Sequence, residues 1–187
     1  MVACDFFVVI TAAFRTLYVF LVLEIASRRI LHYNVTAHPA PEWTLQQFRE
    51  APGDHLYRFL IHDRDRIFAK EVDRGLANLG VRVLRTPVRA PKANAVCERL
   101  GGSLRRECLD FLLPLNERHL HRIIREWTTH YNRGRPHSAL GPGLPEPFSD
   151  HAPLNEYRHR LPIGYRIVKR SVLGGLHHEY RLTKEAA

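Results

Sequence analysis

The chain has 187 residues, of which 45% are hydrophobic and 25% charged. This composition is that of a folded globular protein and excludes a disordered chain, and the length allows one well-buried domain with an appendage. The formal net charge of +9 favours an acidic partner, nucleic acid above all, with a merely solubilising surface as the alternative.

The first 36 residues predict three consecutive short strands. Residues 4–14 and 17–24 are rich in Val, Ile, Phe and Tyr, and the polar break at Arg15 and Thr16 predicts a hairpin between them. Residues 30–36 alternate between apolar and polar side chains, as a half-exposed strand does. Because Arg15 interrupts the long apolar run in this region, neither a membrane-spanning helix nor a signal peptide is predicted.

Helices and strands alternate over the next fifty residues. A helix is predicted over residues 44–50, with Thr44 as its N-cap, after a Pro-Ala-Pro breaker. A short apolar strand over 57–61, a helix over 68–79 and a strand over 81–84 follow. This alternation predicts that the later strands add to the sheet in parallel.

Two further helices are predicted after a proline-containing loop at residues 87–91. Asn94 can cap a helix that runs to about Phe111, and residues 117–131 predict a helix with one apolar face. A stretch rich in proline and glycine then ends the compact domain, which we place at residues 1–148. The apolar face of the second helix consists of Leu120, Ile123, Ile124 and Trp127.

The remaining residues, 149–187, form a basic C-terminal tail. Residues 165–168 and 179–182 predict a small β-hairpin around a pair of glycines. So short a segment buries little core, and we therefore expect a docked tail rather than a second domain.

The cysteines indicate neither a disulfide framework nor a zinc ribbon. Cys4, Cys97 and Cys108 are odd in number, and no Cys-x-x-Cys pair is present. Reduced thiols that pack as small core side chains fit this pattern, and they predict a cytoplasmic protein.

Three acids stand where a carboxylate is unfavourable. Asp5 interrupts an apolar strand, Asp63 ends another, and Glu98 lies among seven basic residues between positions 82 and 106. A buried carboxylate costs several kcal/mol unless it is paired or bound to a metal. If the strands share one sheet, the three acids can converge, and hard oxygen ligands without local His or Cys select Mg²⁺ or Mn²⁺.

Such a site would hold two ions and act on a phosphodiester, with a water or a 3′-hydroxyl as the nucleophile. The alternative is that each acid pairs with a nearby base. Asp63 would then pair with Arg64 or Arg66, and Glu98 with an arginine such as Arg105.

Several segments, in this order, resemble the catalytic core of DDE transposases and retroviral-type integrases. They are Asp5 with the Phe-Phe-Val-Val that follows it, HDRDRIF at 62–68, and TPVRAPKANAVCER at 86–99. LRRECLD at 104–110 and HYNRGRPHSAL at 130–140 look like segments of bacterial insertion-sequence transposases. The resemblance covers roughly residues 3–147.

The resemblance implies an α/β, RNase H-like fold with a five-stranded mixed sheet flanked by helices. It also implies an enzyme, a polynucleotidyl transferase that nicks and joins mobile-element ends and target DNA as a multimer. Asp5, Asp63 and Glu98 take the metal-ligand and catalytic roles, with Asp63 favoured over Asp65 because Phe68 lies five residues after it. The candidate DNA-binding residues are Lys92, Asn94, Arg99, Arg105 and Arg106, with Asn94 also a helix cap.

Two other functions stay open at this point. Relatives carry an end-recognition domain ahead of the core, whereas Asp5 lies close to Met1, so a truncated, non-catalytic DNA-binding remnant is one alternative. A structure-selective nuclease with the same fold is the other.

Gly101 and Gly102, in the helix after Glu98, each cost about 1 kcal/mol relative to Ala.

Overall fold

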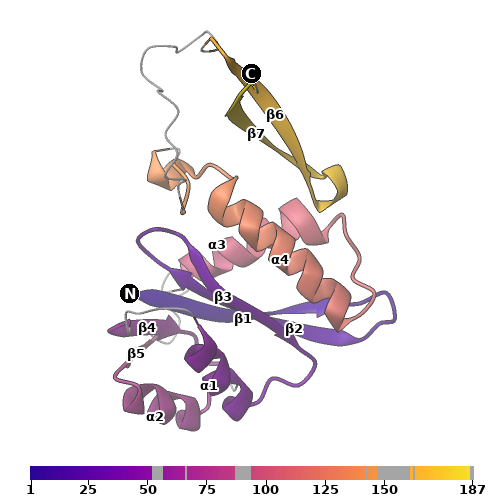
Figure 1. Cartoon of the computed structure of the whole chain (residues 1–187). Coiled ribbons are helices and arrows are strands. Elements are labelled where there is room, and N and C mark those ends of the chain that lie inside the picture. Colours follow the sequence, from indigo (N-terminus) through magenta and orange to yellow (C-terminus); the bar gives the residue numbers. More distant parts are fainter. Residues whose placement is uncertain are drawn as a thin grey trace. The chain divides into compact units, whose positions relative to one another are not determined.

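Figure 1 shows a computed structural model of the chain. It describes residues 1–51, 57–65, 67–86, 94–141, 143–146, 161 and 163–185. The chain divides into two compact units, residues 1–125 and 126–187, which are described separately. The division between these units lies within helix α4, and the domain boundary at residue 148 stays a prediction.

A mixed five-stranded sheet forms the centre of the first unit, as predicted. Its strand order is β3-β2-β1-β4-β5. Strand β1 (Val2–Ile10) pairs antiparallel with β2 (Thr16–Glu24), which pairs antiparallel with β3 (Ile30–Thr36). Strand β4 (Phe59–His62) is parallel to β1, and β5 (Arg82–Arg85) is parallel to β4. The strand that carries Asp5 is therefore the central one.

The turn between β1 and β2 is longer than the sequence predicted. Residues 11–14 were expected to continue the first strand, but they form the turn, in which the Phe14 N–H donates to the Thr11 carbonyl oxygen. Phe14 has a φ of 56° and is 90% exposed. A left-handed conformation cannot continue a strand, which explains the difference.

Helices cover both faces of the sheet (Figure 1). Helices α1 (Pro41–Glu50) and α2 (Lys70–Asn78) cover one face, where the Phe6 ring packs against Trp43 and Phe68. On the opposite face lie α3 (Ala95–Leu104), which packs on β1, and α4 (Glu117–Arg133). The buried side chains between the sheet and α1 and α2 are Val2, Cys4, Phe20, Val22, Leu60, Phe68, Val72 and Leu76.

Two helix boundaries differ from the predictions. Thr44 is not an N-cap, because α1 begins at Pro41 and the Thr44 N–H already donates to the Ala40 carbonyl oxygen. Proline is compatible with the first turn of a helix, so the Pro-Ala-Pro segment starts α1 instead of only separating elements. The helix predicted to run to Phe111 ends as an α-helix at Leu104 and continues as a π-helical turn, Arg105–Leu109.

Helix α4 has the predicted apolar face. Leu120, Ile123, Ile124 and Trp127 are each at most 5% exposed. Among the residues that the structure describes, none of the helices combines the length and apolarity needed to cross a membrane.

The second unit joins the end of α4 to a hairpin of β6 (Tyr165–Val172) and β7 (His177–Lys184). Nδ1 of His130 lies 3.0 Å from Oε1 of Glu179, and both side chains are buried. The guanidinium of Arg181 lies 3.2 Å from the other carboxylate oxygen of Glu179. The contact between His130 and Glu179 links the last turns of α4 to β7.

The segment after α4 folds back on the helix end. The Tyr131 ring packs against His137 with ring centroids 4.5 Å apart, and the Arg135 guanidinium lies 5.8 Å from the Tyr131 ring centroid. The Glu146 N–H donates to the Asn132 carbonyl oxygen. These contacts end the helix and fix the chain that leaves it.

We expect Gly101→Ala to raise the free energy of unfolding by about 0.5–1 kcal/mol, because alanine is the better helix former and its Cβ would meet no atom within 4 Å. Gly75→Ala in α2 is the control, since its Cβ would lie 2.4 Å from Leu45 and the gain is offset by that side chain's displacement. Urea unfolding of both variants measures the difference. Equal shifts would contradict the assignment of free space at Gly101.

Candidate active site

Asp5 and Glu98 face the same cavity in the first unit. Asp5 lies on the central strand β1, and Glu98 lies in the first turn of α3, which packs on that strand. The cavity has a volume of about 310 Å³, and Cys97, Gly101 and Arg105 contribute to its lining. The structure therefore brings together two of the three predicted acids.

Asp5 is half-buried, and its environment opposes ionisation. Burial, followed by the charge of Asp63, raises the pKa of Asp5 to about 7, although the Phe6 N–H donates to its carboxylate at 2.8 Å. Glu98 and Asp65 raise this pKa further. Asp63 and Glu98 thus both act electrostatically on Asp5, and a bound cation would relieve this repulsion.

The predicted alternative, in which each acid pairs with a neighbouring base, is not formed by the described residues. The Arg105 guanidinium donates instead to the Val8 carbonyl oxygen at 2.8 Å, and Arg64 donates to the Thr86 carbonyl oxygen at 2.9 Å. Arg66 lies outside the described residues. Within the described part of the chain, no ion pair involves Asp5, Asp63 or Glu98.

A buried polar network holds the strand end that presents Asp63. His62 is 1% exposed, its Nε2 lies 2.9 Å from Oδ1 of Asp73, and its Nδ1 faces the Asp63 carbonyl oxygen. Asp73 also accepts a hydrogen bond from Nε of Arg85 at 2.6 Å, and the His62 ring stacks on Phe68. The sequence analysis missed this network. Its signal was a histidine at a buried strand position, where a polar ring needs partners.

Asp63 and Asp65 have different local roles. Oδ1 of Asp63 accepts the Asp65 N–H at 3.0 Å, and Oδ1 of Asp65 accepts the Ile67 N–H at 3.2 Å. Both acids therefore shape the turn after β4. Asp63 raises the pKa of Asp5 more than Asp65 does, and the choice of Asp63 over Asp65 as a ligand stays a prediction.

Asn94 links α3 to the central strand and does not cap the helix. Its side chain makes no capping hydrogen bond, and its Nδ2 donates to the Cys4 carbonyl oxygen at 3.4 Å. Its own carbonyl oxygen accepts the Glu98 N–H at 3.1 Å. Asn94 thus occupies the predicted N-cap position, but its amide group is turned towards β1 and no capping hydrogen bond forms. Asn94 thereby links the backbone at Cys4, next to Asp5, to the backbone at Glu98.

The other predicted DNA-binding residues differ in exposure. Arg99, Arg105 and Arg106 are exposed, whereas Asn94 is 5% exposed and its side chain does not reach the surface. Lys92 lies outside the described residues. Asn94 is therefore better described as a positioning residue than as a DNA contact.

The buried thiols near the acids are not metal ligands in this arrangement. Burial, followed by the charges of nearby acids including Asp5, raises the pKa of the Cys97 thiol well above its usual value. Burial likewise raises the pKa of Cys4. Protonated thiols are poor ligands, so carboxylate oxygens are the available donors.

The three acids lie near one another, but their side chains do not form a complete set of metal ligands in this structure. In the described ranges, no group of three or more His, Cys, Asp or Glu side chains lies close enough to hold a metal ion. Mutual repulsion of carboxylates opposes such a cluster when no cation balances it. The donor chemistry of three carboxylates nevertheless suits Mg²⁺ or Mn²⁺.

Comparison of the sequence with known families gave one match. Residues 79–145 match the sequence profile of the integrase core domain family, and this stretch includes Asn94 and Glu98. A search of the curated proteins gave no match to the sequence.

Solved catalytic domains of integrases and transposases share the fold. The catalytic core of HTLV-2 integrase, solved with magnesium in a dimeric form, has a TM-score of 0.58 at 12% identity, covering 77% of this chain and 91% of that one. The BIV integrase core has a TM-score of 0.55 at 14% identity, covering 76% and 90%. The Mos1 transposase catalytic domain has a TM-score of 0.57 at 14% identity, covering 68% and 70%.

The fold is thus that of integrase and transposase catalytic cores. The RNase H-like fold class and the resemblance to DDE transposases and retroviral-type integrases, both predicted from the sequence, are confirmed.

We expect Asp5→Asn to change how stability depends on pH in a chelating buffer. Near pH 4 the wild-type carboxyl is protonated in the folded chain, but as the pH rises towards 7 the unfolded chain ionises first, so the wild type loses stability. Asn cannot ionise. The variant should therefore gain on the order of a few kcal/mol relative to wild type between pH 4 and pH 7, measured by urea unfolding. A difference that does not change with pH would contradict this.

We expect Asp73→Ala to destabilise the protein by about 1–3 kcal/mol. The reason is that His62, which is buried, and Arg85 both lose their carboxylate partner. Glu71→Ala, two residues away in the same first turn of α2, is the matched control. Glu71 is 61% exposed and pairs only with exposed Arg74, so its loss should cost less than about 1 kcal/mol. Thermal unfolding of the two variants compares them, and equal losses would argue against the network.

Proposed function

We propose that this chain is a metal-dependent polynucleotidyl transferase core that nicks DNA strands and joins them during integration or transposition. The observation that carries the proposal is the acid cluster itself. Asp5 and Glu98 share one cavity, Asp63 acts electrostatically on Asp5, and no described base neutralises any of them. Uncompensated carboxylates in a basic protein fit a cation and a polyanionic substrate together.

Asp5, Asp63 and Glu98 would hold Mg²⁺ or Mn²⁺, with two ions as the expected number. Such ions supply Lewis-acid stabilisation of a phosphodiester and activation of a water or 3′-hydroxyl. The protein's own residues position the acids: β1 fixes Asp5, Asn94 joins α3 to β1, and the buried His62 holds the end of β4. Arg99 and Arg106 are exposed near Glu98 in sequence and are available to flanking phosphates.

The partner we propose is DNA, both mobile-element ends and target DNA. Transposition needs two element ends held together, so we propose that the chain works as a homo-oligomer on DNA. The dimeric and trimeric forms in which HTLV-2 integrase cores were solved are in keeping with this. We place the activity in the cytoplasm, at the nucleoid, where DNA and reduced thiols coexist.

A non-catalytic DNA-binding remnant is the second candidate. One observation favours it, namely that the described acids do not form a ligand set in this structure. This candidate retains DNA binding that is sensitive to salt and independent of divalent ions.

We expect Glu98→Gln to abolish nicking and joining of labelled DNA in Mg²⁺ or Mn²⁺, with a loss of at least about 10²-fold, because an amide is a poor ligand for a hard cation. Glu50→Gln is the control, since this exposed residue lies on α1, on the other face of the sheet, and its hydrogen bond from Gln46 can survive the change. A gel assay of labelled strands measures both products.

Three outcomes separate the candidates. Activity that survives Glu98→Gln or persists in chelator would overturn the proposal. DNA binding without cleavage by the wild type would select the remnant. Hydrolysed products with no joined strands would select a structure-selective nuclease.

A further inference from the structure

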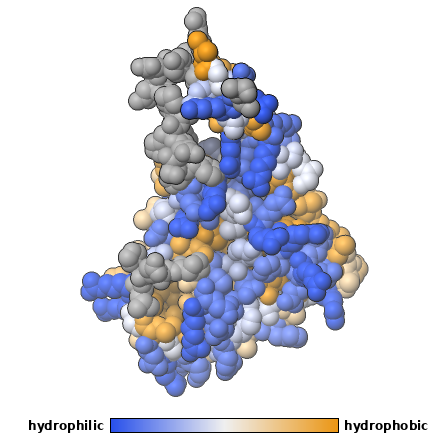
Figure 2. Space-filling model, in the orientation of Figure 1, coloured by the Kyte–Doolittle hydropathy of each residue, from blue (hydrophilic) through white to orange (hydrophobic). Residues whose placement is uncertain are grey.

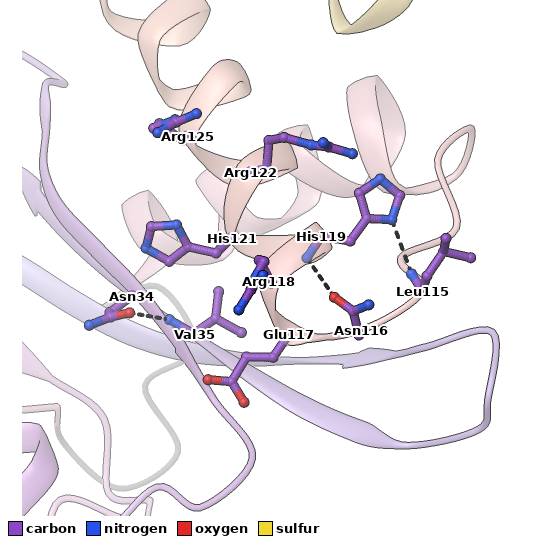
Figure 3. A pocket seen from close by; sticks show the side chains of 10 residues that line it. All are labelled: Asn34, Val35, Leu115, Asn116, Glu117, Arg118, His119, His121, Arg122 and Arg125. Atoms are coloured by element: carbon purple, nitrogen blue, oxygen red, sulfur yellow. Dashed lines mark hydrogen bonds between the residues drawn. The ribbon is translucent and has the colours of Figure 1, made fainter.

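A second cavity in the first unit is lined largely by cationic side chains. It has a volume of about 740 Å³ and lies between the edge strand β3 and the first half of α4 (Figure 3). It shares no lining residue with the cavity of Asp5 and Glu98. We call it the α4 groove. Its lining residues are Asn34, Val35, Leu115, Asn116, Glu117, Arg118, His119, His121, Arg122 and Arg125.

The three arginines of the α4 groove form a row on one side of the helix. Arg118, Arg122 and Arg125 are spaced four and three residues apart, which places them on one face. At 1.5 Å per residue the row is about 10 Å long. Phosphates of one DNA strand advance about 3.4 Å along the duplex axis, so the row spans several of them and exceeds a single phosphate ion.

Two of the three arginines in the α4 groove lack a described charged partner. Among the described residues, Arg118 and Arg122 form no ion pair and no hydrogen bond through their side chains. Glu117 is the one acid in the lining, and its carboxylate points away from Arg122 and Arg125 (Figure 3). In the view of Figure 2, hydrophilic side chains cover the region of α4.

This arrangement works against the stability of the helix. Like charges three and four residues apart repel each other, and Arg118 adds a positive charge to the positive end of the helix dipole. Local sequence choices that oppose folding are typical of functional sites. An anion in the α4 groove would turn both unfavourable terms into favourable ones.

The histidines of the groove are held in place by the surrounding structure. The Leu115 N–H donates to Nδ1 of His119 at 3.2 Å, so the neutral ring carries its hydrogen on Nε2 and can donate there. The His121 ring packs on Tyr33 of β3, with ring centroids 5.2 Å apart. The lining therefore offers fixed donors beside the arginines.

The α4 groove lies on the same face of the sheet as the acids. Asp5 pairs with Leu21, and Leu21 pairs with Tyr33, so Asp5 and the strand position that contacts His121 lie in one row across three strands. Neighbouring strands are about 4.8 Å apart, which puts these two backbone positions about 10 Å from each other. One DNA duplex can contact both regions.

We propose that the α4 groove binds the phosphodiester backbone of DNA, as a contact surface separate from the acid cluster. Arg118 and Arg122 bind phosphate oxygens through their planar guanidinium groups, and His119 and His121 add donors. This inference rests on the proposed function in that DNA is the substrate in both. Backbone contacts of this kind position a duplex and carry no sequence preference.

The test is DNA binding by the full chain in chelator, where no metal-dependent chemistry occurs. Fluorescence anisotropy with a labelled duplex compares Arg118→Gln/Arg122→Gln with a control, Arg49→Gln/Arg74→Gln, which removes the same charge from α1 and α2. We expect about a tenfold loss of affinity for the groove variant and a decrease of about two in the slope of log affinity against log salt. The control variant should retain most of the wild-type affinity and most of the wild-type salt slope.

Two further measurements separate binding from folding. The melting temperature of the groove variant should equal or exceed that of wild type, because repulsion within α4 is relieved. Arg118→Lys/Arg122→Lys keeps the charge and should retain the wild-type salt slope, even if affinity falls slightly.

Several results would overturn the proposal. They are an unchanged affinity of the groove variant, an equal loss in both double variants, or competition by poly-aspartate as strong as competition by DNA, which would point to an acidic protein partner. The proposed function fails separately, when wild type does not nick or join DNA with metal. A loss of binding in the groove variant would still support the α4 groove in that case.

Discussion

The carboxylate of Asp5 is half-buried in the central strand of the sheet, where no described cation neutralises it. Burial and the neighbouring acids Asp63 and Glu98 raise its pKa to about 7, so the folded chain in isolation opposes the ionised form. Such a cost can be tolerated only where the rest of the structure compensates for it. The core around Phe6, Phe20 and Phe68 on the other face of the same sheet provides that compensation.

Placement of the other two acids depends on contacts that do not involve the acids' own side chains. Glu98 is placed because Asn94 bonds both to the Cys4 carbonyl oxygen and, through its own carbonyl, to the Glu98 N–H. Asp63 is held in place because the neighbouring His62 contacts the Asp63 carbonyl oxygen through Nδ1 and Asp73 through Nε2. These contacts fix the backbone at both acids, as a rigid scaffold does for reactive groups, and Oδ1 of Asp63 additionally accepts the Asp65 N–H.

Much of the fold followed from local patterns, and the exceptions have physical reasons. The alternation in β3 and the apolar face of α4 were readable because each pattern matches a single burial geometry. The ends of β1 and α1 were less readable, since Phe14 adopts a left-handed conformation and Pro41 starts a helix. Boundaries of this kind depend on one residue's backbone angles rather than on a repeated pattern.

The candidate site shows the same division. Asp5, Asp63 and Glu98 were identifiable because a carboxylate beside apolar strands, or alone among bases, contradicts its surroundings. Asn94 was misread as a cap, since asparagine at a helix start has that role locally and only the fold reveals its bond to β1. The His62–Asp73 pair joins residues eleven apart across a turn, and no spacing rule anticipates it.

The first unit has an acidic region around Asp5 and a basic region along α4, and within each region like charges repel one another. Carboxylates repel one another around Asp5, and guanidinium groups repel one another along α4, although opposite charges placed together would stabilise the folded chain. Natural proteins keep such arrangements where activity outweighs stability. A substrate that brings anionic phosphates to the arginines, together with cations bound by the acids, relieves both. The first unit thus presents an acidic and a basic region on the same face of its sheet, which is the pattern that the proposed metal-bearing phosphodiester substrate would require.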